Sequence, residues 1–176
     1  MPGIDETLAF RPLNIAILTV SDTRTIETDK SGTTLQERAE GAGHNVVRRA
    51  IQPDDLTGLM AHLNTWVDDE AIDVILTTGG TGVTGRDVTP EAVEAIGEKH
   101  IPGFGELFRW LSYKLISTST IQSRATAVVS RGTYIFALPG SPGACRDAWD
   151  GILADQLDIR HKPCNFAELI PRLREE

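Results

Sequence analysis

Short apolar runs rich in branched residues alternate along the chain with longer segments whose apolar positions repeat with helical spacing. Four of the short runs predict strands, at residues 14–20, 44–51, 72–78 and 133–138. Helices are predicted from Ser31 to the glycines Gly41 and Gly43, from Asp54 to Val67, from Thr89 to about Gly97, from Gly103 to about Ile116, and from Ser141 to about Leu157. This alternation predicts βαβ units, and therefore an α/β fold whose mostly parallel sheet is flanked by helices.

Other segments give weaker signals. Residues 117–125 are rich in serine and threonine, which favours a loop with a short helix, and no element is predicted after Arg160. At 176 residues the chain is expected to form a single domain, 1–176, with a core at about 12–160 and a tail at 161–176. Trp110 lies on an apolar side of its predicted helix, which is typical of a core or a subunit contact.

Charge and cysteine content narrow the class of protein. The chain has 25 acidic against 17 basic residues and a net charge of −8, which argues against nucleic acid or an anionic membrane as a partner. It has two cysteines, too few for a disulfide framework, and an N-terminus with acids where a signal peptide would have bases. No apolar run approaches the roughly 20 residues of a membrane span. We therefore expect a cytoplasmic protein.

The third strand runs directly into four residues, Gly79-Gly80-Thr81-Gly82, of which three are glycines. Glycine permits positive φ and a close approach of the backbone to a ligand, and successive backbone amides can form a nest for an anion. The same string is equally typical of a tight turn between a strand and a helix. It is neither GxGxxG nor a P-loop, so a Rossmann cofactor or a Walker-type site is not indicated.

The last strand ends in a second glycine turn, Pro139 to Gly143. Ser141 is a preferred N-cap residue, and Pro142 suits the first position of a helix. Ligands of parallel α/β sheets bind beyond the carboxyl ends of the strands, so both glycine turns are expected at one crevice. Gly140 and Ser141 can bind a second phosphate or a polar ring edge there, or they can simply form a turn and a cap.

Carboxylates follow the same strands. Asp87, beyond the glycine loop, can hold Mg²⁺ between phosphates or pair with the neighbouring Arg86. Asp54 follows the second strand, where it can cap a helix or line a crevice. Ser21 and Asp22 follow the first strand and can form a turn at the same edge.

Taken in order, these motifs resemble one family. LNIAILTVSDTR, DKSG, TTGGTG, RDVTPEA, STSTIQSRA and IFALPGSPGACR are similar to the MoaB/MogA family of molybdenum cofactor biosynthesis proteins, over about residues 12–166. The segments LFRWLSYKLISTSTIQSRA and RHKPCNFAEL resemble the MoaB branch, whereas RDVTPEA resembles the MogA-like form. The resemblance implies a three-layer α/β/α fold that binds molybdopterin, a pterin with a dithiolene and a terminal phosphate. Active members transfer AMP from MgATP to that phosphate, and members assemble as trimers or hexamers.

Carried over to this sequence, the resemblance implies catalytic roles for Asp87 and Asp54, with Mg²⁺ at Asp87. The residues expected to bind substrate or nucleotide are Ser21, Asp22, Gly79, Gly80, Thr81, Gly82, Gly140 and Ser141. Two other functions stay open. One is a carrier or scaffold that binds molybdopterin without catalysis, and the other is an unrelated nucleotide-binding domain of the flavodoxin type.

Overall fold

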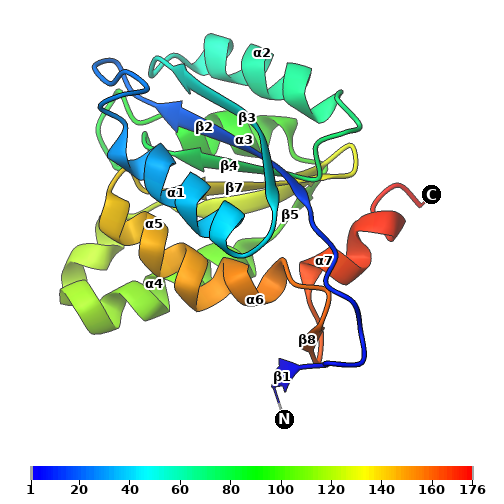
Figure 1. Cartoon of the computed structure of the whole chain (residues 1–176). Helices are drawn as coiled ribbons and strands as arrows, with labels where there is room; N and C mark the ends of the chain where they lie inside the picture. The colour runs from blue at the N-terminus through cyan, green and yellow to red at the C-terminus, as the bar shows by residue number, and fades with distance from the viewer. Residues whose placement is uncertain (1, 176) are drawn as a thin grey trace.

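Six strands form one mixed sheet with the order β3–β2–β4–β7–β6–β5 in the computed structural model, which describes residues 2–175 (Figure 1). The strands of this sheet are β2 (Asn14–Val20), β3 (Asn45–Gln52), β4 (Val74–Thr78), β5 (Lys99–His100), β6 (Thr126–Ser130) and β7 (Thr133–Leu138). A separate antiparallel pair joins β1 (Gly3–Ile4) to β8 (His161–Lys162). This pair extends away from the sheet, beside the N-terminal end of the chain (Figure 1).

The four strands β3, β2, β4 and β7 are parallel, which confirms the predicted mostly parallel sheet. Strands β6 and β5 are antiparallel additions at the β7 edge, and the sequence pattern did not predict them. Strand β6 has only five residues, follows directly on a segment rich in serine and threonine, and returns to β7 through a tight turn. Such a strand gives little periodic signal of its own.

Helices cover both faces of the sheet, so the architecture is the expected three-layer α/β/α fold. The helices are α1 (Lys30–Gly41), α2 (Leu56–Val67), α3 (Thr89–Ile96), α4 (Pro102–Ile116), α5 (Pro142–Ala148), α6 (Ala154–Gln156) and α7 (Phe166–Leu169). Short 3₁₀ segments, η1 (Ser117–Gln122) and η3 (Ile170–Arg172), follow α4 and α7, and a π-helical turn, η2 (Trp149–Leu153), joins α5 to α6. In Figure 1, α2 and α3 lie on one face of the sheet, and α1, α4, α5 and α6 lie on the other.

Each face of the sheet has its own hydrophobic core, because successive side chains of a strand point to opposite faces. In β7, for example, Phe136 packs into the core beneath α1, α4 and α5, whereas its neighbours Ile135 and Ala137 pack into the core beneath α2 and α3. Every residue of β4 and of β7 is buried. The central strands are therefore covered on both faces, as parallel strands usually are.

Two predicted N-cap residues were wrong by one or two positions. Asp29 rather than Ser31 caps α1, accepting the N–H of Gly32 at 2.9 Å. Asp55 rather than Asp54 caps α2, accepting the N–H of Gly58 at 2.6 Å. In both cases two residues able to cap stand close together, and only the backbone conformation decides which of them does so. The predicted Ser141 cap is confirmed by its bond from Ala144 N–H at 3.1 Å.

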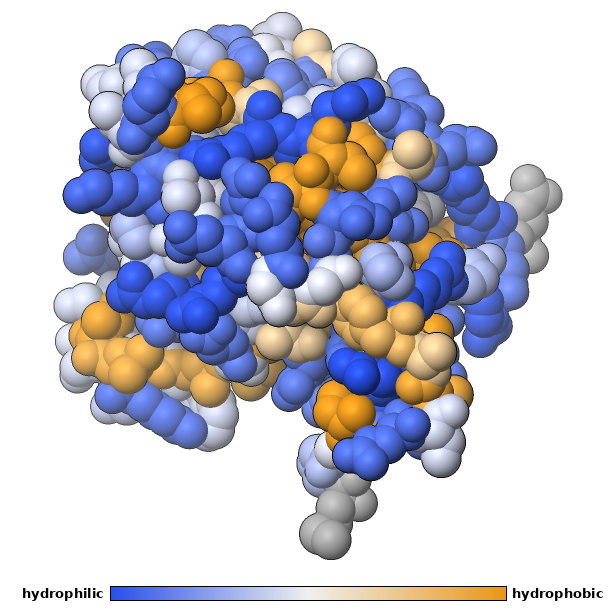
Figure 2. Space-filling model, viewed as in Figure 1, coloured by the Kyte–Doolittle hydropathy of each residue, from blue (hydrophilic) through white to orange (hydrophobic). Residues whose placement is uncertain are grey.

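Helix α4 packs on the sheet through Phe104 and Phe108 and turns an apolar face outward. The exposed apolar side chains of α4 and η1 are Leu107, Trp110, Tyr113, Leu115, Ile116 and Ile121, which we call the α4 surface. Trp110 is 57% exposed, so it does not fill the core, whereas Trp66 and Trp149 are buried. Figure 2 shows a hydrophobic area at the lower left, where Figure 1 places α4.

The segment after Arg160, for which no element was predicted, contains β8, α7 and η3. Phe166 of α7 packs against Tyr134 and Phe136 of β7, so this segment contributes to one of the two cores. Among residues 2–175 there is no helix with the length and apolar character that a membrane crossing requires.

Candidate functional site

The two glycine turns of the sequence meet at the carboxyl ends of β4 and β7, which are parallel neighbours in the sheet. Gly79, directly after β4, donates its N–H to the carbonyl of Leu138, the last residue of β7, at 3.0 Å. A Cβ added to Gly140 would lie 3.1 Å from the Cα of Gly79, so the two turns are in contact. The hydroxyl of Ser31 in α1 donates to the carbonyl of Gly140 at 3.1 Å and ties a third segment to this contact.

The first glycine turn adopts a backbone that requires glycine. Gly79 has φ of +105° and Gly80 has φ of +64°, a region that side chains with a Cβ rarely adopt. A Cβ on Gly79 would overlap the carbonyl oxygen of Val20 in the neighbouring strand. A Cβ on Gly80 would collide with the side chains of Thr89 and Asp54. Glycine is therefore required at both positions, because β2, the start of α3 and the segment after β3 all approach the turn closely.

Thr89 anchors this turn from the start of α3. Its hydroxyl donates to the carbonyl of Gly79 at 2.8 Å, and its N–H donates to the carbonyl of Gly80 at 3.0 Å. Thr89 is the first residue of the helix and its side chain does not cap it, so the predicted N-cap role was wrong. Because both bonds go to carbonyl oxygens, they leave the N–H groups of Gly80 and Thr81 for other partners.

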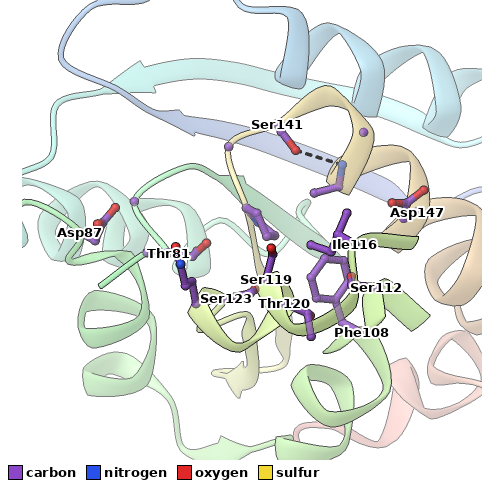
Figure 3. Close-up of a pocket in the computed structure, with 17 residues that line it drawn as sticks. Thr81, Asp87, Phe108, Ser112, Ile116, Ser119, Thr120, Ser123, Ser141 and Asp147 are labelled. Carbon is purple, nitrogen blue, oxygen red and sulfur yellow. Dashed lines mark hydrogen bonds between the residues drawn. The ribbon is translucent and has the colours of Figure 1, made fainter. Parts of the chain in front are cut away.

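A cavity of about 510 Å³ opens beside the two turns. It is lined by Gly80, Thr81, Gly82, Asp87, Phe108, Ser112, Ile116, Ser119, Thr120, Gln122, Ser123, Pro139, Gly140, Ser141, Gly143, Ala144 and Asp147. Figure 3 shows Asp87 at one end of the cavity and Asp147 at the other, with the hydroxyl side chains between them. A cavity of this size can enclose a small organic molecule.

Backbone N–H groups at the cavity wall are available to a ligand. Among residues 2–175, the N–H groups of Gly80, Thr81, Gly140 and Ser141 form no hydrogen bond with another protein group. Neighbouring free N–H groups at a turn and at the start of a helix form a site with positive potential. This arrangement can hold the oxygens of a phosphate without a basic side chain.

Asp87 lies at the rim of this cavity, and its carboxylate folds back on its own loop. One carboxylate oxygen accepts the N–H and the hydroxyl of Thr84, at 2.8 and 2.7 Å. The hydrogen bond from the Thr84 hydroxyl, with help from the N–H groups of Thr84 and Gly82 and the charge of Arg124, holds the pKa of Asp87 below its ordinary value. Asp87 is therefore ionised at neutral pH.

Asp54 and Asp22 lie beside the glycine turn but do not line the large cavity. Asp22 accepts the N–H of Asp54 at 3.1 Å and forms an ion pair with Arg86, which lowers the pKa of Asp22. Burial raises the pKa of Asp54, and repulsion from Asp22 and Asp87 adds to this, against the attraction of Arg86. The structure thus places two of the predicted residues one layer away from the cavity wall.

Ser21 and Gly79 line a second, smaller pocket of about 130 Å³ on the other side of the contact between the turns. Lys30 and Arg24 also line it, so its wall is more basic than that of the large cavity. Gly140 lines both spaces and separates them together with Gly79. The predicted residues other than Asp22 and Asp54 therefore line two adjoining spaces at one edge of the sheet.

Comparison with known proteins identifies the family. The family described as "Probable molybdopterin binding domain" matches residues 16–159. The chain belongs to this family. It is 49% identical over 157 residues to "Molybdenum cofactor biosynthesis protein B" of Escherichia coli (strain K12), covering 89% of this chain and 92% of that protein. Family membership associates the chain with molybdenum cofactor biosynthesis, as the resemblance of its motifs predicted.

Solved structures of the molybdopterin-binding family have the same fold. A crystal structure of Molybdenum cofactor biosynthesis protein B superposes with a TM-score of 0.86 at 39% identity, covering 96% of this chain and all of that one. The tungsten cofactor synthesizing protein MoaB from Pyrococcus furiosus superposes with a TM-score of 0.77 at 31% identity, covering 95% of this chain and all of that one. These relatives confirm the predicted MoaB branch and leave no place for an unrelated flavodoxin-type domain.

Two of the predicted carboxylates, those of Asp54 and Asp87, lie against the glycine loop. Residues 2–175 contain no group of three or more histidine, cysteine or acidic side chains that could hold a metal ion. Asp54 and Asp87 lie against one loop, since their carboxylate oxygens would be 2.7 and 2.8 Å from a Cβ on Gly80 and on Gly82, respectively. Mg²⁺ is commonly held by one or two carboxylates and the phosphates of a substrate. Two carboxylates at one loop are therefore a donor set that could hold Mg²⁺ together with the phosphates of a substrate.

Sequence reasoning missed the wall of the cavity that faces the glycine turns. This wall comes from α4 and η1 and contains Phe108, Ser112, Ile116, Ser119, Thr120, Gln122 and Ser123. The string STSTIQS places a dense set of hydroxyls beside an apolar helix, and this is the sequence signal that could identify the wall. It could not be placed because the antiparallel return of β6 had not been predicted.

Proposed function

We propose that the chain binds molybdopterin in the large cavity and transfers the adenylyl group of MgATP to the phosphate of the pterin. The observation that carries the proposal is the position of Asp87 on the rim of a cavity whose wall includes the free N–H groups of Gly80, Thr81, Gly140 and Ser141. Two anionic substrates have to meet in this reaction. A site with free amides and a carboxylate for MgATP suits that task.

The shape and chemistry of the cavity support a pterin as its occupant. Phe108 and Ile116 offer apolar surface, and the hydroxyls of Ser112, Thr120 and Ser123 offer donors and acceptors within the same wall. A pterin is a flat ring with a polar edge, so it needs both kinds of contact. Free amides of the glycine turns would then be left for the terminal phosphate.

In the proposed reaction a phosphate oxygen of molybdopterin attacks the α-phosphorus of ATP, and the bond to the β-phosphate breaks. The products are adenylyl-molybdopterin and pyrophosphate. The nucleophile is already anionic, so the residues serve mainly to align the two substrates and to offset their repulsion. Bound Mg²⁺ would neutralise part of the triphosphate charge. Asp87, with Asp54 behind Gly80, would hold the nucleotide end, and the glycine turns would fix the pterin phosphate.

The test is an adenylylation assay with molybdopterin, ATP and Mg²⁺, in which adenylyl-molybdopterin and pyrophosphate are measured. We expect Asp87→Ala to lower turnover by at least about 100-fold while molybdopterin binding is retained. Asp150→Ala, an exposed carboxylate on the outer face of η2, is the matched control and should keep full turnover. Normal turnover of the Asp87 variant would remove this residue from the mechanism.

A second function uses the same cavity without catalysis. A carrier or scaffold for molybdopterin would need the free amides and the hydroxyl wall but no second substrate. It predicts tight pterin binding with no pyrophosphate release at any ATP concentration. The same assay therefore separates the two functions.

We also propose that the chain acts as a homo-oligomer, a trimer or a hexamer. The α4 surface supports this, because six large apolar side chains gathered on one helix and its 3₁₀ extension are usual at a contact between proteins. The expected cytoplasmic location, and the expected lack of nucleic-acid and membrane partners, stay predictions.

A further inference from the structure

Arg124 makes an unusual set of contacts with the loop that presents Asp87. It follows η1, and its side chain donates from Nε to the carbonyl of Gly82 at 2.7 Å and from a terminal nitrogen to the carbonyl of Asp87 at 2.8 Å. The remaining terminal nitrogen forms an ion pair with Glu91 in the first turn of α3. Its own N–H donates to the carbonyl of Thr81 at 2.9 Å. One residue thus joins the start of the loop to its end.

The guanidinium reaches the loop from the side away from the cavity. Arg124 lines two open grooves, one with Glu94 and Arg109 and the other with Val83 and Asp87, and it does not line the large cavity. It is therefore not placed to touch a ligand there. Its effect on a ligand in that cavity would pass through the backbone that it holds and through its charge, which helps to lower the pKa of Asp87.

Between its two ends the loop is also tied by the exposed ion pair of Arg86 with Asp22, and its tip is open. Val83 is 66% exposed, and a Cβ on Gly85 would meet nothing within 4 Å, so the tip of the loop lies open to solvent. Within the loop, Asp87 is tied to Thr84, which is itself part of the tip. The bonds from Arg124 and the exposed ion pair of Arg86 with Asp22 connect this unit to the rest of the protein. A planar guanidinium can bind two carbonyls in a fixed geometry, and lysine cannot reproduce this.

We propose that Arg124 is a positioning residue, which holds residues 82–87 in the shape that brings the Asp87 carboxylate to the cavity. The carbonyls of Gly82 and Asp87 point towards Arg124. The N–H groups of Gly80 and Thr81, in the turn before them, are free to bind the ligand. The inference rests on the proposed function for its catalytic consequence. Its structural consequence, a rigid loop at residues 82–87, stands independently of any reaction.

The test compares Arg124→Lys with wild type and with Arg131→Lys as the matched control. Arg131 bonds to Asp68 and Asn64 at the opposite end of the sheet, so it also joins two segments but lies far from the cavity. We expect Arg124→Lys to lower kcat by at least about tenfold and to change the KM for molybdopterin by less than about twofold. Amide hydrogen exchange at residues 82–88 should become at least about tenfold faster. The control should match wild type in all three measurements.

A second variant separates the carbonyl bonds from the ion pair. Glu91→Gln removes the charge partner of Arg124 but leaves both carbonyls in place, and an exposed ion pair contributes little by itself. We therefore expect its kcat and its loop exchange to stay within about twofold of wild type. A Glu91 variant as slow as the Arg124 variant, or an Arg124 variant with unchanged kcat and exchange, would overturn the inference.

A different set of results is expected if the proposed function is wrong. If wild type releases no pyrophosphate, the adenylyl transfer proposal fails and kcat carries no information. Loop exchange in the two arginine variants still decides whether Arg124 holds residues 82–87. Faster exchange in Arg124→Lys alone would then support the positioning role, whereas equal exchange in both variants would end it.

Discussion

The hydroxyl of Thr84 lies 2.7 Å from the carboxylate of Asp87, and the N–H of Thr84 lies 2.8 Å from the same oxygen. Two donors from one residue thus hold the carboxylate that we propose to face the nucleotide. Hydrogen bonds to a charged carboxylate favour the charged form, so Thr84 both orients Asp87 and keeps it ionised. Thr84, three positions earlier in the chain, therefore sets the orientation and the charge of the carboxylate that we propose to act in the reaction.

Thr84→Val should therefore change how activity depends on pH. The variant lacks the hydroxyl that is the largest cause of the lowered pKa of Asp87, so this pKa rises towards its ordinary value. The acid limb of the profile of kcat/KM should move to higher pH, with little change in activity at pH 8. Pyrophosphate release measured from pH 4 to pH 8 tests this. An unchanged acid limb would mean that another group controls it.

Asp54 and Asp55 are adjacent, yet their replacement should change stability in opposite directions. Burial raises the pKa of Asp54 above its ordinary 3.8, so its charged form is disfavoured in the folded protein. Stability is therefore lost as pH rises through the interval from 3.8 to the folded-state pKa, and Asp54→Asn should be more stable than wild type at pH 7. Asp55→Ala loses the N-cap of α2 and should be less stable by about 1 kcal/mol.

Thermal unfolding of the two variants at pH 7 and below pH 3.8 checks both signs. The gain of Asp54→Asn should disappear at the lower pH, where the wild-type carboxyl is protonated in the folded and unfolded states alike. The same variant should be slower in the adenylylation assay. A more stable but less active variant is the pattern expected when a strained group is kept for function. A gain that persists in acid would assign the effect to packing instead of charge.

Gly79 should tolerate no side chain, whereas Gly85 in the same loop should. Alanine at 79 would need φ of +105° and would overlap the carbonyl of Val20, so we expect a loss of at least about 2 kcal/mol in the free energy of unfolding. Gly85→Ala meets nothing within 4 Å and should stay within about 1 kcal/mol of wild type. Denaturant unfolding of the pair measures the difference. Equal stability of the two variants would contradict the tight contact between β2 and the glycine turn.

The sequence was enough to predict the elements whose signal is local. Strands β2, β4 and β7 are apolar runs bounded by turn residues, and the glycine turns after β4 and β7 are distinctive strings, so their meeting at one edge followed from parallel pairing. The N-cap residues of the helices were harder to predict. Asp29 and Ser31 can both cap α1, and Asp54 and Asp55 can both cap α2, and the members of each pair are one or two residues apart. The choice depends on dihedral angles that the sequence does not state.

Features that depend on tertiary contacts could not be predicted. The short strand β6 runs antiparallel to β7, and it brings η1 and Arg124 back against the glycine turn. The hydroxyl wall of the cavity and the contacts of Arg124 depend on the antiparallel pairing of β6 with β7. They could not be predicted because this pairing was not predicted. The side of α4 that packs on the sheet could not be predicted either. Phe104 and Phe108 pack on the sheet, whereas Leu107 and Trp110 are exposed. Both faces of this helix are apolar, so periodicity alone could not decide between them.

Trp110→Glu should dissociate the oligomer. A second copy that covers the α4 surface would have to bury the new carboxylate without a partner, which costs several kcal/mol. Trp110 is 57% exposed and is overlaid by Lys114, with the amine 3.5 Å from the ring centre, so the change leaves the core of one chain intact. Light scattering after size exclusion should give the mass of a trimer or a hexamer for wild type and that of a single chain for the variant.

Leu169→Glu is the matched control for this change. Leu169 is also a large exposed apolar residue, 41% exposed, but it lies on α7, on the other side of the molecule from α4 in Figure 1. It should keep the wild-type mass, because a charge there remains in water. A monomeric wild type would exclude the proposed oligomer. A Trp110 variant that keeps its full mass would move the contact to another face, since an unpaired carboxylate could not persist at the centre of an apolar interface.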